Sequence, residues 1–178
     1  MNSKLFSARF IFITSAIVLA ALSRVLPHFN NFTPIAAMAL FGGVYFSDKR
    51  LAFIVPLVAM ILSDVILEIT TGWGFHNTIV YVYVAFILTS AVGLYVRKNT
   101  TFQTVLGASV ISSLLFFMIT NFGVWAASGG VAGASGLATT YVLGVPFFAP
   151  TLLGDVFYNT ILFGAFYLAQ RRIPALIK

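Results

Sequence analysis

The chain has 178 residues, of which 60% are hydrophobic and only 8% are charged, and its formal net charge is +6. Soluble domains carry about 25% charged residues, so the composition excludes an ordinary water-soluble fold and indicates one integral membrane domain. The basic residues lie in pairs at the ends of apolar runs, which excludes a nucleic-acid-binding face. Cysteine is absent, which excludes disulfides and cysteine-ligated metals.

Six apolar segments follow along the chain, most of them near the ~20 residues that a spanning helix requires. They are residues 10–26, 33–46, 51–69, 78–96, 102–125 and 151–170. We therefore expect an all-α bundle of six transmembrane helices, in a single domain over residues 1–178. The first segment also resembles a signal peptide, but the six-segment count favours an uncleaved helix. The second segment is short, and we interpret it as a spanning helix or as a re-entrant one.

The positions of the basic residues predict the orientation of the bundle. Nine of the ten flank alternate segments on one side: Lys4, Arg9, Lys49, Arg50, Arg97, Lys98, Arg171, Arg172 and Lys178. By the positive-inside rule both termini are cytoplasmic, and the protein is a multi-pass protein of a bacterial inner membrane. The connections on the outer side contain no Lys or Arg, and the last of them, residues 126–150, is long and rich in Gly and Ala. We expect that connection to be a loop, with a short interfacial helix stopped near its prolines.

Charged residues inside the apolar segments are the main functional signal. Counted from the basic flanks at ~1.5 Å per residue, Arg24, Asp64 and Asp155 all lie about 21–24 Å towards the outer side, on three different helices. A charge in hydrocarbon costs at least ~2.5–3.5 kcal/mol, so each must be paired, hydrated or used. The alternative to a functional role is a structural salt bridge between Arg24 and either Asp64 or Asp155. Because Arg24 is the only intramembrane base, the acidic surplus predicts an outward chamber for a cationic or hydrogen-bond-donating ligand.

Aromatic and polar side chains gather near the same depth, which is typical of a pocket for a small, partly aromatic molecule. An interfacial aromatic belt is the alternative explanation. The expected ligand contacts are Arg24, Asp64, Glu68, His76, Tyr81, Asn121, Trp125, Asp155 and Asn159. No metal-binding His spacing, nucleotide-binding motif or HExxH is present, so we expect neither an enzyme nor a metal or cofactor site.

Four stretches carry a family resemblance: "NFTPIAAMALFGGVYF", "PLVAMILSD", "TNFGVWA" and "PFFAPTLLGDVFYNTILFG". They resemble an uncharacterised bacterial membrane family labelled as transport proteins, which is similar to the S components of energy-coupling factor (ECF) vitamin importers. The resemblance implies a substrate-binding subunit for uptake of a vitamin-like micronutrient from the periplasmic side. It also implies that Ala16 and Ala20, small residues four apart, dock an energising membrane subunit driven by two ATPases.

Two other functions remain open from the residues alone. A solitary proton- or cation-coupled carrier would use Asp64 and Asp155 as its proton-binding groups and would work without ATPases. A non-transport membrane scaffold would close its polar groups into salt bridges and leave no cavity. The sequence does not identify the substrate, the partner or the oligomeric state.

Overall fold

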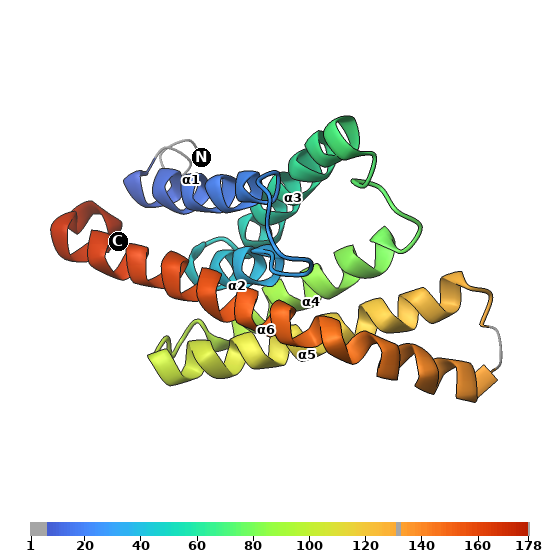
Figure 1. The fold of residues 1–178 in the computed structure, drawn as a ribbon. Coiled ribbons are helices and arrows are strands. Elements are labelled where there is room, and N and C mark those ends of the chain that lie inside the picture. The colour runs from blue at the N-terminus through green and yellow to red at the C-terminus, as the bar shows by residue number, and fades with distance from the viewer. Residues whose placement is uncertain (1–6, 131–132, 178) are drawn as a thin grey trace.

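A computed structural model describes residues 7–130 and 133–177 of the protein, and these residues contain six α-helices and one short 3-10 helix but no strand. The elements are α1 (Ala8–Ser23), α2 (Ile35–Tyr45), α3 (Lys49–Thr71), α4 (Ile79–Val96), α5 (Phe102–Ala127), α6 (Gly133–Arg172) and η1 (Pro174–Leu176). The expectation of an all-α fold is confirmed. Figure 1 shows the helices arranged around α2, which lies near the centre of the molecule.

The centre of the fold is a helix too short to cross a bilayer by itself. α2 has 11 residues, about 16 Å of helix, and every residue from Ile35 to Val44 is buried. It contacts each of the other five α-helices. A helix that is apolar on all sides is stable only when neighbours cover all of its sides, so α2 is the core around which the longer helices pack.

Four helices are long and apolar enough to cross a membrane: α3, α4, α5 and α6. Their outward faces carry many exposed Leu, Ile, Val and Phe side chains, which suits contact with lipid rather than water. These features are consistent with a membrane protein. α1, with 16 residues, and α2 are shorter apolar helices.

The last helix differs from its expected bounds. α6 runs for 40 residues from Gly133 and includes Pro146 and Pro150, where the sequence suggested a loop up to residue 150. Each proline lacks the N–H that would bond four residues back. Because the two prolines are themselves four residues apart, the missing bonds lie on one side of the helix, and the other side continues unbroken. At ~1.5 Å per residue α6 is about 60 Å long, twice the ~30 Å of a hydrocarbon core.

Arg9, Arg97, Arg171 and Arg172 lie at one end of the molecule, which we call the basic end, whereas Arg24 does not. There Arg9 donates to the carbonyl oxygens of Leu176 at 3.2 Å and Tyr45 at 3.1 Å, and Arg97 donates to Phe46 at 2.5 Å. α1 begins at this end and α6 finishes at it (Figure 1). The opposite end, called the far end, carries the α3–α4 connection and the start of α6.

Two glycines allow a close contact between α2 and α4 in the core. A Cβ on Gly43 of α2 would meet the Ser90 carbonyl oxygen and lie 2.8 Å from Gly93 Cα of α4, and a Cβ on Gly93 would lie 2.9 Å from Gly43 Cα. The two glycines therefore let α2 and α4 touch backbone to backbone. Ala20 on α1 is buried and Ala16 packs on the core. The small-residue face of α1 therefore packs within the chain, and docking of a partner at Ala16 and Ala20 stays a prediction.

The glycine contact makes a direct prediction about stability. Gly43→Ala should lower the free energy of unfolding by ~1–3 kcal/mol, because the added methyl group forces α2 away from α4. Chemical unfolding of the detergent-solubilised protein would measure this. Gly107→Ala on α5 is the matched control, since nothing lies within 4 Å of its added Cβ. Equal effects of the two substitutions would contradict the close contact.

Candidate functional site

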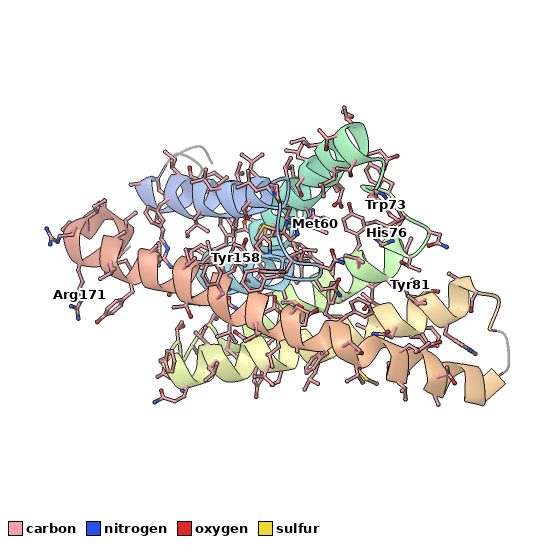
Figure 2. All side chains as sticks on the ribbon, in the orientation of Figure 1. Met60, Trp73, His76, Tyr81, Tyr158 and Arg171 are labelled. Atoms are coloured by element: carbon pink, nitrogen blue, oxygen red, sulfur yellow. The ribbon has the colours of Figure 1, made fainter. Side chains whose placement is uncertain are left out.

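A cavity of about 590 Å³ opens at the far end of the bundle. The connections between α1 and α2 and between α3 and α4 form part of its wall, and residues of α2, α3, α4, α5 and α6 form the rest. Its polar lining is Arg24, Asn31, Thr33, His76, Thr78, Thr120, Asn121, Thr140 and Thr151, and its aromatic lining is Trp73, Phe116, Phe117 and Phe147. Figure 2 shows Trp73 and His76 at this end and Arg171 at the opposite one.

Arg24, the residue that caps the C-terminus of α1, is held at the cavity by three side chains. Its Nη2 lies 2.7 Å from Asp64 Oδ1, and its Nη1 donates to Ser63 Oγ at 2.5 Å and to Met60 Sδ at 3.2 Å. The Tyr83 hydroxyl donates to the other Asp64 oxygen at 2.5 Å. Asp64 is fully buried and Arg24 is 9% exposed. A buried ion pair with these added hydrogen bonds is held in a single geometry.

The pairing decides which charge faces the cavity. Arg24 lines it, whereas Asp64, Glu68 and Asp155 do not. The chamber expected from the sequence was acidic, and the structure differs: within the described residues, its only lining side chain that is always charged is a guanidinium. The reason is that Asp64 lies behind Arg24, between the ends of α1 and α4, where α3 places it.

Glu68 fixes the loop that closes one side of the cavity. Its carboxylate accepts the backbone N–H of Phe75 at 2.9 Å, although the side chain itself is exposed. Gly74 lies directly against the backbone of α3, where a Cβ would be 2.5 Å from the Glu68 nitrogen. The loop therefore folds back on α3 and carries Trp73 and His76 to the cavity. His76 Nδ1 lies 2.9 Å from the Thr78 hydroxyl.

On the opposite wall, Asn121 lines the cavity and donates to the Phe117 carbonyl oxygen at 2.8 Å. Gly144 of α6 admits it, because a Cβ there would overlap the amide group of Asn121. Tyr81 packs its ring on Gly123 of α5 instead of lining the cavity. Both close approaches join neighbouring helices at the far end.

Three other residues expected at the site also lie elsewhere. Trp125 packs beside Gly130, and its Nε1 is buried without a hydrogen-bond partner among the described residues. Asp155 and Asn159 are each 2% exposed, between α5 and α6. Asn159 lines a second cavity of about 450 Å³ nearer the basic end. Of the nine expected contacts, Arg24, His76 and Asn121 therefore line the main cavity and the other six do not.

Sequence reasoning missed the threonines of the cavity. Thr120, Thr140 and Thr151 each donate to the carbonyl oxygen four residues earlier, at 2.7, 2.9 and 2.8 Å. Each hydroxyl oxygen keeps its lone pairs as acceptors facing the cavity. The signal in the sequence is weak, because a threonine inside an apolar helix satisfies itself in the same way when it faces lipid.

Comparison with known proteins shows the family but no activity. Residues 4–176 match a family of unknown function (DUF6580), and the chain belongs to that family. No curated protein matches the chain, and no solved structure matches it. In the described part of the chain no three His, Asp or Glu side chains come together as they would to hold a metal ion.

The ion pair predicts the effect of removing its cation. Arg24→Met should cost ~3–5 kcal/mol of unfolding free energy, because it leaves Asp64 buried and unpaired. Adding Asp64→Asn should restore most of this loss, since asparagine is neutral and its oxygen still accepts from Tyr83. Chemical unfolding of both variants and of the wild type would measure the difference. A double variant no more stable than Arg24→Met would contradict the pairing.

Proposed function

For this member of a family of unknown function, we propose that the far-end cavity binds a small organic molecule and that the protein is the substrate-binding subunit of an uptake system. In this proposal the chain is a six-helix, S-component-like bundle of a bacterial inner membrane. Both termini are cytoplasmic, and the cavity opens to the periplasmic side. The orientation rests on the basic end, because Lys and Arg concentrate on the cytoplasmic side of membrane proteins.

The observation that carries the proposal is the cavity with a fixed guanidinium in its wall. Its volume of about 590 Å³ lies within the ~300–1,000 Å³ of ordinary small-molecule sites. A scaffold would need its polar groups closed against one another and no such space. Here the ion pair is closed behind the wall, while Arg24 and the polar side chains of Asn31, Thr120 and Asn121 remain at the cavity.

The free hydrogen-bonding groups indicate what kind of molecule fits. A guanidinium has five N–H donors. Arg24 directs those of Nη1 to Met60 and Ser63, and its Nη2 lies in ion-pair contact with Asp64 Oδ1 without a hydrogen bond. Its Nε–H and Nη2–H groups have no hydrogen-bond partner among the described residues. They suit an acceptor oxygen, such as a carbonyl or a carboxylate, and the aromatic wall suits an apolar or aromatic body. We therefore favour an acceptor-bearing ligand over the cationic one expected from the sequence.

Transport is favoured because the cavity is at the predicted outer end of a bundle that has no nucleotide-binding motif in its sequence. An importer of this kind needs an energising membrane subunit with two ATPases. A solitary carrier does not, so co-purification from native membranes separates the two mechanisms.

The experiment that tests the proposal fills the cavity. Thr120→Phe places a ring in the cavity and should abolish retention of a small molecule during gentle purification. Met118→Phe, on the same helix but with a side chain that is 52% exposed and outside the cavity, should retain it. Native mass spectrometry of wild type and both variants measures the retained mass.

Two results would count against the proposal. One is a retained molecule that survives Thr120→Phe as well as it survives Met118→Phe, since it would then be bound elsewhere. The other is a folded wild type that carries no extra mass and whose unfolding midpoint does not respond to any compound of a vitamin and cofactor panel.

A further inference from the structure

A line of polar side chains runs between α5 and α6, and we call it the α5–α6 seam. On α6 it contains Thr151, Asp155 and Asn159, spaced four residues apart and therefore on one face of the helix. On α5 it contains Ser109 and Ser113, also four apart. Thr151 lines the main cavity, whereas Ser109 and Asn159 line the second cavity of about 450 Å³. Asp155 thus lies midway between residues that line the two cavities.

Asp155 has no cation to pair with among the described residues. It is 2% exposed, and its carboxyl group forms a hydrogen bond with the Ser113 hydroxyl at 2.5 Å. α6 packs against α1, α2, α5 and η1. On α1 and at its end, Arg9 is bound to backbone carbonyls and Arg24 to Asp64. A bare carboxylate in this position would be an uncompensated buried charge, which proteins avoid.

The remaining titratable groups nearby do not supply a positive charge. α5 carries no Asp, Glu, Lys, Arg or His, and α2 carries only Tyr45. The connection between α1 and α2 carries an exposed His28. On α6 itself, the Tyr158 hydroxyl lies 3.3 Å from the Ser23 hydroxyl. Arg171 is sixteen residues from Asp155, about 24 Å along the helix.

The polar groups of the α5–α6 seam offer fewer hydrogen-bond donors than acceptor oxygens. The Ser109 hydroxyl donates to the Val105 carbonyl at 2.9 Å, so it must accept from Asn159 Nδ2 at 2.7 Å. This leaves Asn159 Oδ1 buried without a donor. Ser113 has one hydrogen, yet its Oγ lies 3.0 Å from the Ser109 carbonyl oxygen and 2.5 Å from Asp155 Oδ2. One additional proton on Asp155 lets the Ser113 hydroxyl group bond both of these oxygen atoms, and it leaves Asn159 Oδ1 without a donor.

We propose that Asp155 is a proton-binding site built into the α5–α6 seam between the two cavities. Its carboxylate takes up one proton and becomes a neutral carboxylic acid. The acid then donates its O–H to Ser113 Oγ, and the Ser113 hydroxyl donates to the Ser109 carbonyl oxygen. The seam carries no net charge in this state and gains one negative charge when the proton leaves. The inference does not depend on the proposed substrate-binding function.

Protonation of Asp155 sets a sign for the pH dependence of stability. A folded state that holds a proton more tightly than the unfolded chain loses stability as pH rises. The unfolding midpoint of the wild type in detergent should therefore fall as the pH is raised through the neutral range. Asp155→Asn, the neutral isostere, should fold and keep a midpoint that is nearly constant over this range.

A spectroscopic measurement reads the proton directly. Infrared difference spectra of the wild type between low and high pH should contain the C=O stretch of a protonated carboxyl group, and this band should be absent from Asp155→Asn. Asp48→Asn is the matched control. It neutralises an exposed carboxylate that caps the N-terminus of α3, a position that asparagine fills equally well, and it should leave both the band and the pH dependence of the wild type.

Three results would overturn the proposal. The first is the same pH dependence in Asp155→Asn as in the wild type. The second is failure of Asp155→Asn to fold, which would mean that a charged carboxylate is required. The third is a stability that follows sodium at constant pH and ionic strength instead of following pH, and that loses this dependence in Asp155→Asn. That result would assign the site to a metal cation.

Discussion

The ion pair between Arg24 and Asp64 is the constraint on which the far end of the molecule depends. It joins the end of α1 to the middle of α3, and Tyr83 extends it to α4. In an apolar bundle neither charge is stable alone, because the cost of removing each from water is offset only by the other and by hydrogen bonds. The pair therefore holds three helices in one arrangement and leaves the guanidinium at the wall of the cavity.

The core at the centre of the bundle has a different basis. Apart from the hydrogen bonds that Arg9 and Arg97 make at its C-terminal end, α2 is held by close packing, and the contact between Gly43 and Gly93 brings its backbone against that of α4. Glycine matters here because lipid offers apolar side chains as good an environment as the protein does, so helices associate through fit and not through burial from water. The bundle therefore has a tightly packed centre and a polar far end that contains the main cavity.

The two buried acids show how much depends on the neighbours of a charge. Asp64 and Asp155 lie at similar depths by sequence, and both are nearly inaccessible. Asp64 has a guanidinium and a phenol as partners, whereas the partner of Asp155 is a serine hydroxyl. The same residue type is a structural anion in one position and a candidate proton carrier in the other. In our proposals Asp64 holds Arg24 at the wall of the ligand cavity, and Asp155 sets the charge between the two cavities.

The sequence by itself determined the properties that follow from its composition and from the length and spacing of its apolar runs. An apolar run of about 20 residues has few stable forms in a membrane other than a helix, so the all-α fold and the bounds of α3, α4 and α5 were predicted closely. Basic residues flank the apolar segments at alternate ends, and this pattern predicted that one set of connections lies on the same side of the bundle. The stretch around Pro146 was expected to be a loop because proline usually ends a helix. The sequence pattern did not reveal that the two missing hydrogen bonds, one turn apart, lie on the same side of the helix and leave its other side intact.

Only the tertiary structure decided which polar side chains meet. Arg24, His76 and Asn121 reach the cavity, but Glu68 instead holds the loop beside it, and Asp155 faces α5. Depth along a helix can be counted from the sequence, whereas the direction of a side chain around the helix depends on which neighbour packs against each face. In a chain that is apolar on nearly every face, the hydrophobic pattern does not specify that rotation. Contacts as specific as Gly43 on Gly93 or Gly144 on Asn121 do specify it.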